Sequence, residues 1–356
     1  MNVYVMDSSL RRIGVIDTYR SIIWVQRYYR AGDFELYLDA TQDTIDLCQK
    51  GRYLYREGDY QDGVFRSVMI IQYVQLNTSI DDGNTLLIKG PDIKSIIGRR
   101  IIWSQTVLSG TLENNIRSVL TSNIINPSIT ARKISNFVLG DAMGGTPTVQ
   151  VQATGNAIDA WLTDQIMPYE IGYDIQIIDG NFVFTLYKGT DRSYDQSTNP
   201  YVIFSPDFEN LLSSDYVESD VDLKSFALVA GEGEGNARRT TTAGDSSVTG
   251  INRIELFVDA RDVSSKTDSG TLPDSEYIAQ LQQRGIEKLS AYKSVEVFEG
   301  KVEAETNFIF GTDYLLGDKV EIINEYGIEA SARIVEIIDS EDTEGRTVVP
   351  TFSTGG

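Results

Sequence analysis

The chain has 356 residues, 41% of them hydrophobic and 23% charged, and its 52 acidic against 31 basic residues give a formal net charge of −21. The length suggests about two or three domains, and the composition is typical of a soluble globular protein. Histidine is absent and Cys48 is the single cysteine, which excludes histidine-based catalytic triads, zinc sites built from His or Cys, iron–sulfur clusters and ordinary haem ligation.

The negative charge argues against tight wrapping of nucleic acid, which needs basic surface to displace counterions. Its ordinary interpretation is solubility through self-repulsion. A more specific hypothesis is that acidic side chains line a passage through which DNA slides without binding. The sequence also lacks an apolar run near the roughly 20 residues of a membrane span and the features of a signal peptide, and one cysteine suits a reducing compartment.

Residues 1–98 are predicted to form a first tube-like β domain. Between 34 and 38, apolar residues alternate with polar ones, which indicates a strand with one buried face. Further strands are expected at 52–57, 68–75 and 86–88, with a short helix at 41–50 and a turn at 81–84. The unit is therefore expected to be a small antiparallel sandwich or barrel with one helix.

Residues 99–205 are predicted to form a small α+β middle module. Thr111 is placed to cap one helix, and Pro168 is expected to end a second helix. That second helix carries an apolar face made of Ile158, Trp161, Leu162 and Ile166. Asp179-Gly180 lies between two alternating segments and favours a tight β-hairpin, because these residues tolerate positive φ angles.

Residues 206–356 are predicted to form a second tube-like β domain. Strands are expected at 221–230, 251–259, 295–305, 319–324 and 330–338, with polar loops at 231–250 and 262–272 that should be mobile in an isolated subunit. A helix is expected to begin at Pro273, and Gly285 lies in its apolar stripe. Because glycine inside a helix costs roughly 1 kcal/mol against alanine, a neighbouring backbone is expected to approach closely there.

The two β domains are suggested by an internal repeat. Residues 34–40 read Phe-Glu-Leu-Tyr-Leu-Asp-Ala and residues 254–260 read Ile-Glu-Leu-Phe-Val-Asp-Ala. The separation is far longer than the roughly 20–50 residues of a solenoid repeat. We therefore expect two copies of one β-rich domain, so that three chains could build a ring of six units.

Candidate chemistry is sparse. The alternation Gly231-Glu-Gly-Glu-Gly235 places acidic side chains where a phosphate loop needs none, and the turn at 81–84 lacks the closing Glu of a calcium loop. A spatial pair of carboxylates for glycoside hydrolysis stays open among 52 acidic residues. The stretch Arg27-Tyr-Tyr-Arg30 could stack on bases, but its acidic surroundings favour a packed strand or a subunit contact. We expect no cofactor and no metal.

Several segments in this order resemble the tail-tip or baseplate hub proteins of siphophages, which often form the N-terminal part of tail-associated lysins. The segments are Gly32 to Leu38, Gly51 to Glu57, Met69 to Tyr73, Trp161-Leu162, Asp179-Gly180, Gly189 to Arg192 and Asp313 to Val320. The resemblance implies a homotrimer whose two tube-like domains per chain form a pseudo-sixfold ring. Such lysins often carry a peptidase or glycosidase after the hub; this sequence stops at Phe352-Ser-Thr-Gly-Gly356, and no lytic domain is expected in it.

The expected function is therefore that of a structural virion protein without catalysis. It would be made in the host cytoplasm and located in the tail tip, joining the hexameric tail tube or distal tail ring to threefold spike or fibre proteins. DNA would pass without being bound, and no membrane contact is expected in the mature particle. The alternatives are a carboxylate-based polysaccharide or cell-wall hydrolase and a carbohydrate-binding module of a phage tail.

Five residues are candidates for these roles. Glu35 and Glu255 occupy matching positions of the repeat and are candidates for the wall of the DNA passage. Tyr28, Tyr29 and Gly285 are candidates for contacts between subunits.

Overall fold

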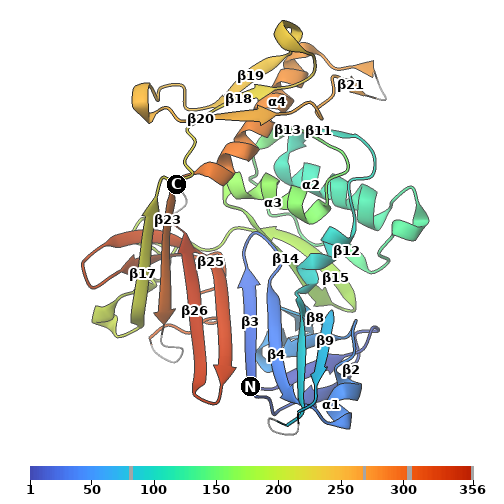
Figure 1. Ribbon diagram of the computed structural model, residues 1–356, viewed down its shortest axis with the longest axis vertical. Helices are drawn as coiled ribbons and strands as arrows, with labels where there is room; N and C mark the ends of the chain where they lie inside the picture. Colours follow the sequence, from blue (N-terminus) through green and yellow to red (C-terminus); the bar gives the residue numbers. More distant parts are fainter. Residues whose placement is uncertain (80–82, 268–269, 303–306, 354–356) are drawn as a thin grey trace.

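The computed structural model describes residues 1–79, 83–267, 270–302 and 307–353 (Figure 1). Parts of three predicted segments, the turn at 81–84, the loop at 262–272 and the strand at 295–305, lie outside the described residues. Strands dominate the chain, and most strand pairs are antiparallel.

The N-terminal region is a β-sandwich with one apolar core. One layer is a four-stranded sheet in the order β2-β1-β5-β8, and the other belongs to a larger sheet that contains β3, β4, β10 and β9. The strands are β1 (Val3–Met6), β2 (Arg12–Ile16), β3 (Ser21–Arg27), β4 (Asp33–Asp39), β5 (Tyr53–Arg56), β8 (Met69–Ile70), β9 (Tyr73–Asn77) and β10 (Thr85–Pro91), with helix α1 (Gln42–Leu47). As the alternation predicts, Phe34, Leu36 and Leu38 lie in the core, together with Cys48.

The middle module follows a 3-10 helix, η2 (Ile93–Arg99), and packs helices against two small sheets around the largest core. Its elements are β11 (Thr106–Thr111), α2 (Leu112–Leu120), β12 (Phe137–Leu139), β13 (Thr148–Ala153), α3 (Ile158–Ile166), β14 (Gly172–Ile178) and β15 (Asn181–Tyr187). The sheet β12-β15-β14 is extended by two short strands of the N-terminal region, β7 (Val64–Phe65) and β6 (Tyr60–Gln61). The two regions therefore share a sheet.

Local signals in this module are confirmed. Thr111 Oγ1 accepts a hydrogen bond from Asn114 N at 3.4 Å, and α3 ends two residues before Pro168. Asp179 and Gly180 have φ angles of 50° and 76°, and Ile178 pairs with Asn181, as a two-residue hairpin turn requires.

The C-terminal region has its own core but is interrupted by a separate subdomain. Its strands are β16 (Ile203–Phe204), β17 (Leu211–Ser219), β23 (Val295–Val302), β24 (Lys319–Ile323), β25 (Glu329–Asp342) and β26 (Gly345–Ser353). Between β17 and β23 lies what we call the inserted subdomain, with a fourth core, made of β18 (Phe226–Ala230), β19 (Thr240–Gly244), β20 (Glu255–Asp259), β21 (Lys266–Thr267), β22 (Gly270–Thr271) and α4 (Asp274–Leu289). Figure 1 shows α4 and β18–β20 at the end of the molecule away from the large sheet.

One continuous sheet joins the N- and C-terminal regions. Its main path runs β17-β23-β26-β25-β3-β4-β10-β9, and every pairing along this path is antiparallel. Numbered by chain order within each half, β3-β4-β10-β9 has the order 1-2-4-3, and so has β17-β23-β26-β25. The chain therefore holds two four-stranded units of the same internal order, joined where β3 of the first pairs with β25 of the second.

The two segments of the sequence repeat do not occupy equivalent strands, contrary to the prediction. Residues 34–40 fall in β4, but residues 254–260 fall in β20, which lies in the three-stranded sheet β19-β18-β20 and pairs in parallel with β18. By strand order, the counterpart of β4 is β23. Short alternating strands resemble one another whatever sheet they enter, because the pattern reports one buried face and not a position in the fold.

The predicted fold class, mainly β with an α+β middle region, is confirmed. The described residues form no closed barrel within one chain. The loop predicted at 231–250 contains β19, whose sequence Thr-Thr-Thr-Ala-Gly has β-favouring threonines but lacks the apolar alternation on which the prediction relied.

Candidate functional site

The main sheet has one side that faces away from the cores of the N- and C-terminal regions, and we call this side the open face. Alternate residues of each strand point to it, because successive side chains of a strand lie on opposite sides. One row across six strands, taken from the strand register, consists of Tyr73, Lys89, Glu35, Ile23, Ser340 and Thr347. The row crosses from one unit to the other without a break.

Two cations on the open face, Lys89 and Arg27, are paired with carboxylates. Lys89 forms an ion pair with Glu35, and the hydrogen bond from Lys89 lowers the pKa of the Glu35 carboxyl below its ordinary value. Arg27 lies 2.5 Å from Glu336 and 2.5 Å from Asp33, so one guanidinium holds two carboxylates. Neither of these two cations is therefore free to bind a phosphate group.

The two acidic residues predicted to line a passage do not lie together. Glu35 is half-buried in β4, near the middle of the N-terminal unit. Glu255 is exposed on β20 and lies 2.7 Å from Arg253 within its own segment. Because β20 belongs to the inserted subdomain, Glu255 does not lie on the open face.

Tyr28 is buried within the chain and offers no surface to a second subunit, contrary to the prediction. Its hydroxyl points to the carbonyl oxygens of Glu170 and Tyr187, at 3.2 and 3.1 Å, and its relative exposure is 0%. Its ring lies against two glycines: a Cβ at Gly172 would be 2.1 Å from the ring, and one at Gly317 would be 2.4 Å from it. Tyr28 therefore joins three regions of one chain.

Gly285 also has an internal role. A Cβ there would lie 2.6 Å from Ala243 Cβ and 2.7 Å from Val229 Cγ2, so the helix α4 packs closely on β18 and β19. The predicted close approach exists, but the nearest atoms are side-chain methyl groups of the same chain and not a neighbouring backbone.

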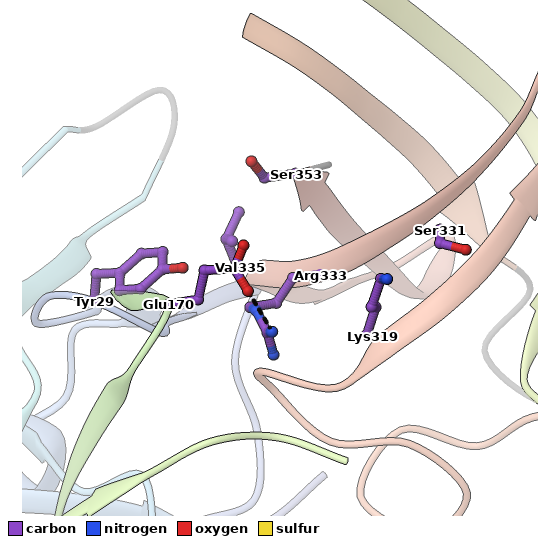
Figure 2. A pocket seen from close by; sticks show the side chains of 7 residues that line it. All are labelled: Tyr29, Glu170, Lys319, Ser331, Arg333, Val335 and Ser353. Atoms are coloured by element: carbon purple, nitrogen blue, oxygen red, sulfur yellow. Dashed lines mark hydrogen bonds and ion pairs between the residues drawn. The ribbon is translucent and has the colours of Figure 1, made fainter. Parts of the chain in front are cut away.

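Tyr29 is half-buried and lines a pocket of about 130 Å³ between the middle module and β25 (Figure 2). Arg333 lies on one wall, where it donates to Glu170 Oε2 at 2.9 Å and to the Gly317 carbonyl oxygen at 2.6 Å. Glu170 has a left-handed backbone (φ 54°) at the end of a 3-10 turn. Sequence patterns gave no signal for this pair, since its members are 163 residues apart.

The charged side chains that line this pocket already form ion pairs. Arg333 pairs with Glu170 within the pocket, and Lys319 lies 2.6 Å from Asp195, which is not one of the lining residues. Among the described residues, no three acidic or cysteine side chains cluster in a way that could hold a metal ion. No helix among the described residues is long and apolar enough to span a membrane.

Comparisons with known proteins point to one group. The model of the family described as Siphovirus ReqiPepy6 Gp37-like protein matches residues 2–353. No curated protein matches the chain.

Three solved tail proteins share the fold. The tail protein of Neisseria meningitidis MC58 is 13% identical, with a TM-score of 0.62, over 99% of this chain and 95% of its own. The 43 kDa tail protein of prophage MuSo2 from Shewanella oneidensis is 14% identical (TM-score 0.58; 99% and 98% covered), and the prophage tail protein gp18 from Listeria monocytogenes is 15% identical (TM-score 0.55; 99% and 94%). At these identities, the likeness is one of fold.

Proposed function

Because the chain belongs to the Siphovirus ReqiPepy6 Gp37-like protein family, a family of phage tail proteins, we propose that it is the trimeric hub of a bacteriophage tail tip or baseplate. The predicted resemblance to siphophage tail proteins is thereby confirmed. Neither the family description nor the three similar structures name an enzyme. The proposed role is structural and needs no catalysis.

The observation that carries this proposal is the repeated strand order in the main sheet. Two units with the order 1-2-4-3 follow one another head to tail, through the pairing of β3 with β25. Head-to-tail contacts close into a ring when the rotation between successive units allows it. Three chains with two units each would present six similar units to a sixfold tail tube and three identical chains to a threefold spike or fibre.

The open face suits the wall of a DNA passage. Lys89 and Arg27 on this face are paired with carboxylates, and the chain as a whole carries a net charge of −21. Backbone phosphates provide most of the sequence-independent attraction between proteins and DNA. A neutralised and acidic wall would therefore let DNA slide during ejection. The neighbours along the axis would be the tail tube or distal tail ring and the spike or fibre proteins.

The mass of the purified chain in solution and its appearance in negative stain test the proposal. A trimer of the 39.6 kDa chain in threefold rings with a central opening is the expected result. A monomer that cleaves or binds bacterial polysaccharide would overturn it and favour the hydrolase or carbohydrate-binding alternatives.

A further inference from the structure

We propose that a cluster of cations and one tryptophan on the middle module is a docking surface for an acidic segment of a different protein. We call this cluster the arginine patch, and it comprises Arg99, Arg100, Trp103, Arg132 and Lys133. Its first two residues lie at the end of η2, and Arg132 ends a 3-10 turn, η4 (Thr130–Arg132). The surface itself is independent of the proposed ring, but the inference that its partner is another tail protein rests on the proposed function.

The cations of the arginine patch have no carboxylate partner. Most other arginines of this acidic chain form ion pairs, but among the described residues no Asp or Glu pairs with the four cations of the patch. Asp159 lies beside Gly98, where an added Cβ would be 2.2 Å from its Oδ2, and still forms no such pair. Burial and the neighbouring Arg100 lower the pKa of the Arg132 guanidinium below its ordinary value. A bound anion would relieve this repulsion between like charges.

Two guanidinium groups of the patch are already held in place by oxygen atoms of the chain. Arg100 Nε donates to the Arg132 carbonyl oxygen at 2.7 Å, and Arg100 Nη1 donates to the Arg99 carbonyl oxygen at 2.9 Å. Arg132 donates to the Ile101 carbonyl oxygen and, at 3.4 Å, to Asn123 Oδ1. Each guanidinium keeps further N–H donors free. Because the side chains are fixed beforehand, binding costs them little entropy, and their planar ends suit the two oxygens of a carboxylate.

Exposed apolar side chains accompany these cations. Trp103 is 54% exposed, and Arg132 Cζ lies 4.8 Å from the centroid of its ring. Ile101 and Ile129, which both accept a hydrogen bond from Arg132 through their carbonyl oxygens, are 40% and 41% exposed. Tryptophan and arginine are enriched among the residues that contribute most to binding at protein interfaces. The partner therefore needs apolar side chains as well as carboxylates.

A protein segment fits this composition better than a nucleic acid or a lipid surface. The phosphates of a nucleic acid could bind the arginines but would leave Ile101 and Ile129 uncovered. Anionic lipids attract basic clusters through diffuse charge, for which mobile lysines suffice, so fixed arginines would add nothing there. The net charge of −21 opposes an acidic partner only weakly, because salt screens charges beyond about 8 Å at physiological ionic strength. The occupant is therefore an acidic protein segment that also carries apolar residues.

The fluorescence of Trp103 reports whether the patch is occupied, because the other two tryptophans, Trp24 and Trp161, are 0% and 5% exposed. A synthetic peptide of alternating glutamate and leucine should shift the emission to shorter wavelength and protect Trp103 from quenching by acrylamide. Added salt should weaken this binding. The corresponding peptide of lysine and leucine should have no effect.

Charge reversal shows whether the patch itself binds the peptide. The double variant Arg99→Glu/Lys133→Glu changes two exposed positions and should weaken binding by about tenfold or more, with unchanged circular dichroism. Arg30→Glu/Lys50→Glu makes the same change of charge at two exposed positions of the N-terminal region and should leave the affinity unchanged. Equal losses in the two double variants would overturn the assignment of the patch.

A photo-crosslinking amino acid in place of Trp103 identifies the partner in assembled particles. The cross-linked peptide should come from a different protein and contain acidic and apolar residues, and the same replacement at Tyr326, which is 83% exposed, should not yield it. Cross-links only to DNA, to lipid or to a second copy of this chain overturn the proposal, as does the absence of both cross-linking and peptide binding. A trimer with neither signal keeps the hub and removes the patch, whereas a monomer that binds the peptide keeps the patch and removes the hub.

Discussion

The Asp339 carboxylate accepts a hydrogen bond from Arg56 Nη1 at 2.6 Å and thereby ties β25 to β5, between strands of the C- and N-terminal regions. Asp339 is 1% exposed and Arg56 is 5% exposed. Arg346 donates twice to the same carboxylate, and Arg56 also holds Asp59. The N- and C-terminal regions, joined by the pairing of β3 with β25, thus share a network of charges centred on the buried Asp339.

Replacing Asp339 with Asn should lower the free energy of unfolding by about 3 kcal/mol or more, because loss of one partner leaves a buried guanidinium under-compensated. Chemical denaturation measures this value. Glu344→Gln, at an exposed carboxylate of the same hairpin, should change it by less than about 0.5 kcal/mol. Equal effects of the two variants would show that the network does not hold the units together.

Replacing Gly285 with Ala should destabilise the inserted subdomain. The added methyl group would lie 2.6 Å from Ala243 Cβ, and overpacking of this kind typically costs about 1–3 kcal/mol, more than the roughly 1 kcal/mol gained in helix propensity. Hydrogen exchange of β18 and β19 should therefore become faster. Gln282→Ala, on the exposed side of α4, serves as the control, and unchanged exchange in Gly285→Ala would contradict the tight contact.

Asp92 should make stability depend on pH. Burial raises the pKa of its carboxyl from 3.8 to about 6, although the carboxylate accepts hydrogen bonds from Gly32 N and Lys94 N. The folded state therefore binds this proton more tightly than the unfolded state, and ionisation of Asp92 costs stability as pH rises through about 6. From pH 7 to pH 5, this residue should add about 1 kcal/mol of stability.

Denaturation of the native chain and of Asp92→Asn at both pH values measures this contribution. The native chain should gain about 1 kcal/mol more than the variant on acidification, since the amide does not titrate. Parallel pH profiles of the two proteins would rule out Asp92 as the titrating group.

Neutralising Glu35 should slow the release of DNA from assembled particles. Glu35→Gln removes the carboxylate that pairs with Lys89, so a free ammonium would face passing phosphates. Release rates from virions that carry the variant provide the measurement. The double variant Glu35→Gln/Lys89→Gln should restore the native rate, and Glu255→Gln, away from the open face, should not change it. A native rate in Glu35→Gln would remove this residue from the passage wall.

Turns, helix ends and strand faces could be predicted from the sequence where the local conformation accepts only a few residue types. Asp179-Gly180 specified a turn because both residues adopt positive φ, and Pro168 lies just beyond the end of α3. Alternation at Phe34 to Leu38 placed a strand with the correct buried face. These features depend on neighbours within a few residues.

The remaining features depend on partners far along the chain. Arg333 and Glu170 meet across 163 residues, and the equivalence of β4 with β23 emerges only from the order of strands in the sheet. Tyr28 seemed available for a neighbouring subunit because nothing nearby in sequence showed that Gly172 and Gly317 would enclose its ring.

The inserted subdomain leaves and re-enters the main sheet at adjacent points, since Ser219 at the end of β17 is the register partner of Val295 at the start of β23. The gap between Ser219 and Val295 is short enough for a tight turn to bridge it without disturbing either strand. Evolution could thus replace the inserted subdomain, residues 220–294, by one of different shape or specificity while the proposed ring of main-sheet units stays the same. Diversity among related tails would then be expected to concentrate there.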